Sequence, residues 1–217
     1  MKSVLRRCSL WAAVWTLCLQ LVACSSTPPI RFHSLLPMQS APRFLPVVPE
    51  VVPVVPGFAF TLAPVSVPSQ VDQPQWLLRN ADGSLSLLEQ ERWVAPLRGE
   101  LQGALTDRWT HGWGGRAEVT VPAKEAVWRI TVDVTRWESV PGREVRLEAR
   151  WSATAGSLVL RCTSVIQEAA LNDASASPIL ALAASHRRAV TRLADEIASR
   201  LGETKKAGAA RCSDARV

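Results

Sequence analysis

The chain has 217 residues, a formal net charge of +6, 15 prolines and nine tryptophans. Three of the basic residues, Lys2, Arg6 and Arg7, precede an apolar run over residues 8–21, the pattern of a secretory signal. Removal of that signal lowers Lys+Arg from 25 to 22 against 19 acidic residues, so the net charge falls to +3. With so small a charge, and no Lys/Arg-rich block with interleaved aromatics, we expect no nucleic-acid partner.

The apolar run ends in Leu21-Val22-Ala23-Cys24-Ser25, which has the order of a bacterial lipobox. In such a sequence the cysteine thiol takes the lipid as a thioether, becomes the mature N-terminus and is then N-acylated. Residues 1–23 are therefore predicted to be a signal peptide, and Cys24 is the predicted lipidation site. An N-terminal transmembrane helix is the disfavoured alternative, because the apolar run is short for a bilayer span.

Residues 24–56 are predicted to form a lipid-anchored tether and a proline-rich segment, with a short strand near 31–36. From Pro42 to Pro56 a proline recurs every three or four residues. Such spacing fixes φ and removes backbone donors, so it favours polyproline II or irregular structure. The segment is either a linker or, alternatively, a proline ligand for a partner.

The packed domain is expected over residues 57–201. Apolar residues alternate over 58–67, and the apolar runs 76–79 and 84–88 flank Asp82-Gly83, which predicts a hairpin. Leucines spaced by four predict a helix from about Arg92 to Trp109. Proline is tolerated only near the first turn of a helix, so Pro96 predicts that this helix begins near Trp93.

Three strands are predicted next, over 126–138, 145–152 and 158–166, joined by turns too short for crossovers. A last helix should begin at Ser177-Pro178 and stop at Gly202, leaving residues 202–217 as a flexible tail. This order predicts an α+β fold, a two-layer sandwich of a mostly antiparallel sheet with two helices packed on one face.

Two cysteines and two tryptophans are the candidate site residues of the mature domain. Cys162 and Cys212 can form a disulfide in an oxidising compartment, or remain free thiols. Trp137 is expected on the polar face of its strand and Trp113 in a glycine loop. Exposed tryptophans can mark a partner interface, which makes both residues candidates for one.

No motif for catalysis, a cofactor or a metal is present. The chain has no glycine-rich phosphate loop, and its three histidines do not have ligand spacing. His186 is interpreted as a solvated residue of the last helix, and Glu89, Glu91 and Glu100 as surface or helix-start charges. We therefore expect no enzyme, no cofactor and no metal site.

Several short segments, in this order, resemble one known family. They are the lipobox at Cys24, the strand at 31–37, the run 62–79 that ends in Arg79, the segment 92–97, and the last helix with His186 and residues 193–198. The chain resembles the ABC-type transport auxiliary lipoproteins over most of residues 24–201.

The resemblance implies a lipid-anchored outer-membrane lipoprotein that faces the periplasm. Its partner would be a periplasmic protein with MCE (mammalian cell entry) domains, together with the inner-membrane permease or ABC complex that carries lipids between the membranes. Ser25, rather than Asp, after the cysteine favours sorting to the outer membrane. The alternative is a structural or assembly lipoprotein that binds another envelope complex without transporting lipid, and an anchored hydrolase is a third, weaker hypothesis.

Overall fold

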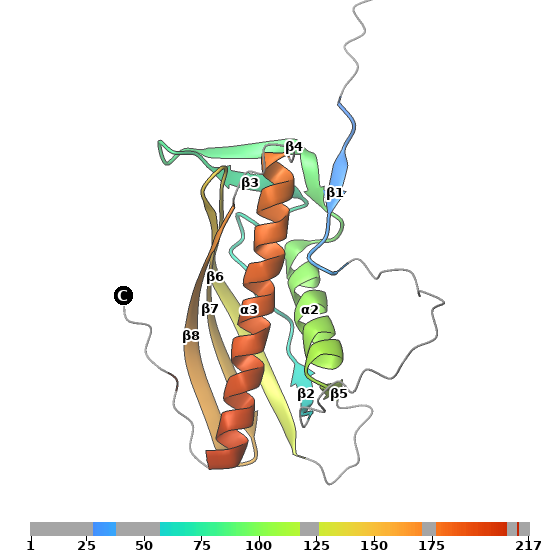
Figure 1. Cartoon of the computed structure of the whole chain (residues 1–217), viewed down its shortest axis with the longest axis vertical. Coiled ribbons are helices and arrows are strands. Elements are labelled where there is room, and N and C mark those ends of the chain that lie inside the picture. Colours follow the sequence, from blue (N-terminus) through green and yellow to red (C-terminus); the bar gives the residue numbers. More distant parts are fainter. Residues whose placement is uncertain (1–27, 38–56, 118–125, 171–176, 208–211, 213–217) are drawn as a thin grey trace, which may run out of the picture.

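The long helix α3 (Pro178–Ala207) lies along one face of a five-stranded sheet, with the shorter helix α2 (Leu97–Asp107) beside it (Figure 1). The computed structural model describes residues 28–37, 57–117, 126–170, 177–207 and 212. Helices pack against mixed, mostly antiparallel sheets, so the predicted α+β fold is confirmed. The described strands, however, form two sheets rather than one.

The larger sheet contains the predicted three-stranded meander. Its strand order is β5–β2–β6–β7–β8, where β5 is Arg116–Ala117, β2 is Ala59–Leu62, β6 is Val127–Val140, β7 is Glu144–Ala155 and β8 is Leu158–Ala169. Strands β6, β7 and β8 are antiparallel, whereas β2 pairs in parallel with β6. Gly142 (φ 69°) and Gly156 (φ 58°) occupy the two turns in the left-handed region that glycine tolerates.

A β-bulge in β6 reverses which of its residues face the helices. Val134 pairs with Ala149, but Arg136 pairs with Glu148, so Thr135 is an extra residue in the ladder. Before the bulge the even-numbered residues are buried, as predicted. After it the odd-numbered Trp137 (6% exposed) and Ser139 (3%) point into the core. The expectation that Trp137 lies on the polar face is therefore wrong.

The smaller sheet has the order β1–β4–β3, with β1 at Arg31–His33, β4 at Leu85–Trp93 and β3 at Gln75–Arg79. Strands β3 and β4 form the predicted hairpin, with Gly83 (φ 87°) in its turn. Strand β1 pairs in parallel with the end of β4, so residues 31–33 are already part of the folded domain. The predicted domain start at residue 57 is too late. The predicted proline-rich segment falls within residues 38–56, which lie outside the described residues.

Both ends of the predicted first helix need correction. Strand β4 continues to Trp93, and α2 begins only at Leu97, with Pro96 (φ −51°, ψ 137°) in the N-cap position. The predicted stripe of Leu97, Leu101 and Leu105 is fully buried. Beyond Asp107 the helix continues as one π-helical turn, η1 (Arg108–Gly112).

Helix α3 begins at Pro178 as predicted but does not stop at Gly202. It continues to Ala207, because Leu201 and Thr204 are both buried and hold its last turns against the domain. A glycine inside a helix costs only about 1 kcal/mol relative to alanine, which this packing offsets. The predicted tail at 202–217 therefore includes the end of a helix.

Candidate functional site

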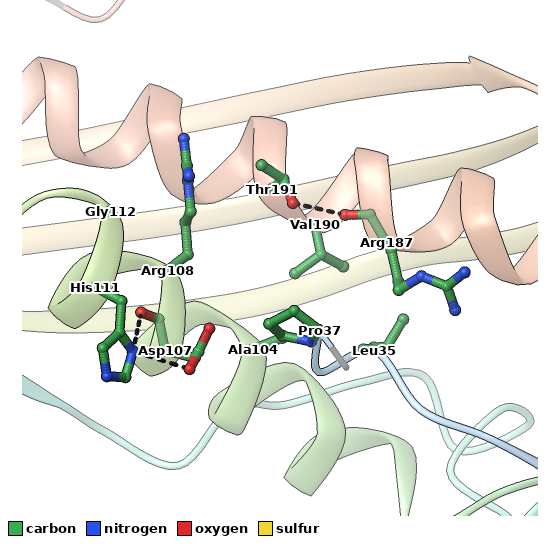
Figure 2. A pocket seen from close by; sticks show the side chains of 10 residues that line it. All are labelled: Leu35, Pro37, Ala104, Asp107, Arg108, His111, Gly112, Arg187, Val190 and Thr191. Carbon is green, nitrogen blue, oxygen red and sulfur yellow. Dashed lines mark hydrogen bonds and ion pairs between the residues drawn. The ribbon is translucent and has the colours of Figure 1, made fainter. Parts of the chain in front are cut away.

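A groove runs between the end of α2 and the middle of α3, with a volume of about 280 Å³ (Figure 2). Apolar side chains from three elements line it, and polar side chains stand at its rim. The lining residues are Leu35, Pro37, Ala104, Asp107, Arg108, His111, Gly112, Arg187, Val190 and Thr191. Two helices and the segment after β1 meet here, so the groove is a candidate surface for a partner.

The charged groups at the rim are already paired within the domain. Arg108 donates two hydrogen bonds to Asp195, at 2.7 and 3.0 Å, and this hydrogen bonding to Asp195 raises the pKa of Arg108 above its ordinary value. His111 Nδ1 lies 3.0 Å from the Asp107 carboxylate, and Arg187 donates to the Ser34 carbonyl at 3.4 Å. Because these charged groups already have partners, the groove is better suited to bind a partner by its shape than to carry out acid–base chemistry.

The π-helical turn fixes the relation of α2 to α3. Trp109 is fully buried, and its indole N–H donates to the carbonyl of Ala194 at 2.9 Å. Trp113, which follows the turn, donates to Asp195 at 2.7 Å, so this carboxylate joins Arg108 and Trp113 to α3. Single π-helical turns within helices are frequent at functional sites. The π-helical turn therefore holds the end of α2 in a fixed position against α3, beside the groove.

Trp113 and Trp137, the two predicted interface tryptophans, lie in different surroundings. Trp113 is partly buried and lines a second, open depression of about 400 Å³ with the last turns of α3. Trp137 is in the core, where its ring stacks on His186 with centroids 4.2 Å apart. A buried ring offers no surface to a partner, so only Trp113 remains an interface candidate.

His186 is a core residue, and its interpretation as a solvated side chain is wrong. The ring is fully buried between α3 and the sheet, and it lies 2.7 Å from the hydroxyl of Ser139. Burial lowers the pKa of His186 from an ordinary 6.5 to about 3. Trp76 and Trp93 also meet this ring edge-on, so an aromatic cluster joins the small sheet to α3.

The Ser139–His186 pair does not have the geometry of a hydrolase. Both side chains are closed off from solvent, at 3% and 0% exposed, so no substrate reaches the hydroxyl. The second ring nitrogen, Nδ1, has no hydrogen-bond partner among the described residues, whereas a catalytic base is oriented by an acidic group there. The pair is a buried polar contact of the core.

Glu91 and Glu100 are buried, contrary to their interpretation as surface charges. Glu91, 4% exposed, pairs with Arg31 and with His33 Nε2, the latter at 2.6 Å. Glu100, 3% exposed, accepts hydrogen bonds from the Ser34 hydroxyl at 2.7 Å and the Leu35 amide at 2.8 Å. The two carboxylates hold residues 31–35 against β4 and α2.

The remaining predicted site residues are the cysteines. The structure pairs Cys162 of β8 with Cys212 as a disulfide, with Cα atoms 5.4 Å apart, which ties the chain beyond α3 to the sheet. Cys24, the predicted lipidation site, lies outside the described residues. Within the described ranges, no cluster of three or more His, Cys, Asp or Glu could hold a metal ion. None of the helices in these ranges is long and apolar enough to cross a membrane.

Known proteins match the chain in two ways: its sequence matches a protein family, and its fold matches solved structures. Residues 46–198, more than half of the chain, match a family described as "ABC-type transport auxiliary lipoprotein component". A crystal structure of a Xanthomonas campestris protein of the DUF330 family matches with a TM-score of 0.55 and 16% identity, over 81% of this chain and 97% of that one. The crystal structure of an uncharacterized protein gives a TM-score of 0.49 and 15% identity, over 66% and 95%.

No curated protein sequence matches the chain. The similarity to the X. campestris structure, at low identity, concerns the fold alone. The family match carries more, because it covers α2 and the part of α3 that lines the groove, and it names a transport component. The chain belongs to the ABC-type transport auxiliary lipoprotein family, and is an auxiliary lipoprotein component of an ABC-type transport system.

Proposed function

We propose that the protein is an outer-membrane lipoprotein, anchored through acylated Cys24, that docks the MCE-domain conduit of an intermembrane lipid transport system. It would act as lipoproteins of the paraquat-inducible lipoprotein C type do. The observation that carries the proposal is the family match together with the lipobox, which lies only six residues ahead of Ile30 and the first strand. A component so tethered is suited to hold a conduit at the membrane.

The anchor is energetically sufficient for this role. Each buried methylene of an acyl chain contributes about 0.8 kcal/mol, and stable attachment needs more than one chain. A diacylated and N-acylated Cys24 meets that requirement. Ser25, rather than Asp, at the next position supports transfer to the outer membrane.

The groove supports docking rather than carriage of lipid within this domain. Its volume of about 280 Å³ lies just below the range of small-molecule sites, which span roughly 300–1,000 Å³. Its rim charges are already paired, so an incoming lipid headgroup would have to displace Asp195 or Asp107. A partner's side chain or loop fits these dimensions better than a whole two-chain phospholipid.

Affinity purification of the acylated protein from membranes tests the proposal. We expect recovery of an MCE-domain protein with the permease or ATPase, and loss of outer-membrane localisation, with weaker recovery, in Cys24→Ala. Recovery of only peptidoglycan-associated or barrel-assembly proteins would instead support a structural or assembly lipoprotein. A groove variant at an exposed lining residue, Thr191→Glu, should reduce recovery of the conduit, whereas Val159→Glu, at an exposed position on the opposite face of the sheet, serves as its control.

A further inference from the structure

One face of the small sheet carries exposed apolar side chains at both ends of β4. Phe32 of β1 is 62% exposed and Val94, which follows β4, is 60% exposed. Ile30, just before β1, is 47% exposed, and Leu85 and Leu87 of β4 are 50% and 42% exposed. We call these five residues the apolar outer face.

The strand register explains why both groups point outward. Gln75 pairs with Arg92, but the next residue of β3, Trp76, pairs with Leu88, so β4 contains three extra residues. An odd number of extra residues exchanges the two faces of the strand. Leu87 therefore points outward near the turn, whereas the equally odd-numbered Trp93 is buried at the other end of β4.

The apolar outer face lies at the end of the domain from which the N-terminal chain departs. Figure 1 shows β3 and the first part of β4 crossing the upper end of the molecule, and the last part of β4 turning down beside β1 toward α2. The ion pair between Arg79 and Glu138 joins the hairpin to the end of β6 that is nearest the β6–β7 turn. The opposite end of the sheet holds the β7–β8 turn.

The length of the tether decides which end of the domain meets the membrane. From Cys24 to Ile30 the chain has six residue steps, which reach at most about 20 Å when fully extended. Strand β6 alone has 14 residues and spans about 45 Å at about 3.3 Å per residue. A lipid on Cys24 therefore keeps the β1 end of the domain near the bilayer. The tether is too short for the opposite end, which holds the β7–β8 turn, to face the bilayer instead.

We propose that the apolar outer face seats against the lipid bilayer in which Cys24 is anchored, and fixes the orientation of the domain. Phe32, Val94 and Leu87 would lie at the boundary of headgroups and acyl chains, with the long cationic side chain of Arg92, which pairs with Phe32 across the strands, at headgroup level. Glu89 lies on the same stretch of β4, so the contact is interfacial and shallow. The groove between α2 and α3 is then presented to the side. This inference rests on the anchor of the proposed function.

A fluorescent label tests the orientation in the acylated full-length mature protein. Val94→Cys, labelled with an environment-sensitive nitrobenzoxadiazole dye, is reconstituted in vesicles of phosphatidylethanolamine and phosphatidylglycerol. Val159→Cys, a valine of similar solvent accessibility (45% exposed) near the β7–β8 turn, is the matched control. We expect a blue-shifted emission that nitroxide-bearing lipids quench at position 94, and a water-like, unquenched emission at 159. Adding Phe32→Ser should reduce the quenching at 94.

Each other outcome overturns the inference for a distinct reason. A protein that floats with vesicles while its label at 94 stays in water refutes the orientation but leaves the anchor intact. A protein that does not float refutes the anchor and the orientation together. A blue shift in the unacylated Cys24→Ser form without lipid, rising with protein concentration, identifies a second copy as the occupant. A shift that requires addition of the MCE-domain protein identifies that partner instead.

Discussion

His186 should make the domain less stable as the pH falls through the range in which free histidine titrates. The ring is fully buried against Trp137, and burial lowers its pKa from an ordinary 6.5 to about 3. The unfolded chain therefore takes up a proton below about pH 6.5, whereas the folded protein does not. Since the unfolded state then binds more protons, this stabilisation is complete above about pH 6.5 and is lost as the pH falls toward 3.

The size of the effect follows from the two pKa values. One pKa unit corresponds to about 1.4 kcal/mol, so the free energy of unfolding should fall by about 2 kcal/mol from about pH 7.5 to about pH 5. For a domain of this size, that loss lowers the melting temperature by about 4–8 °C. Hydrogen bonds from Ser66 and Arg192 hold the pKa values of Asp133 and Glu168 below 3.8 and 4.5, so these groups titrate below the window.

Urea unfolding at the two pH values, followed by tryptophan fluorescence, measures the effect in the mature chain with Cys24→Ser. His186→Gln should be less stable than the parent near neutral pH but should lose the drop of about 2 kcal/mol. His111→Gln, at an exposed ring in η1, should keep the full drop. Equal stability of the parent at both pH values, or an undiminished drop in His186→Gln, would refute the reasoning.

Three further changes test other contacts. Glu100→Leu leaves the buried Leu35 amide unpaired and should cost about 1–3 kcal/mol, with faster hydrogen exchange at that amide, whereas Glu89→Leu on the surface should not. Asp195→Ala removes the acceptor shared by Arg108 and Trp113, so it should lower the free energy of unfolding in urea by about 1–2 kcal/mol. Glu196→Ala, the control, should lower it little, and equal losses in the two variants would contradict the shared contact. Reduction of Cys162–Cys212, 50 residues apart, should lower the unfolding free energy by about 2–4 kcal/mol, and an unchanged midpoint would show that the bond is dispensable.

Local patterns predicted most of the secondary structure because they depend on near neighbours. The alternation along β6, β7 and β8, and the Asp-Gly turn of the β3–β4 hairpin, each lie within a few residues of chain. Alternation alone predicts the wrong face for Trp137, because a single extra residue, Thr135, reverses the alternation and the composition of β6 gives no sign of that bulge. The leucine spacing likewise predicts that Pro96 lies in the first turn of the helix, although it serves as the N-cap of α2.

The buried polar groups could not be predicted in the same way, because their partners are distant in sequence. Glu91 meets His33 across 58 residues, and Glu100 meets Leu35 across 65. His186 did carry a signal: it follows Leu182 by four residues and precedes Ala189 by three, which places it on the buried stripe of α3. The neighbouring Arg187 and Arg188 make the segment polar on average, so its composition indicates an exposed stretch even though the spacing of His186 indicates burial.

The position of β1 ahead of the proline-rich segment has a consequence for engineering. Because β1 is already paired with β4, the number of residues between Pro37 and Gly57 does not set the height of the domain above a membrane. Closing a loop of twice the length costs only about 0.6 kcal/mol. An epitope tag or a small reporter domain inserted there should therefore be tolerated. Lengthening residues 25–30 by the same amount would move the whole domain away from its anchor.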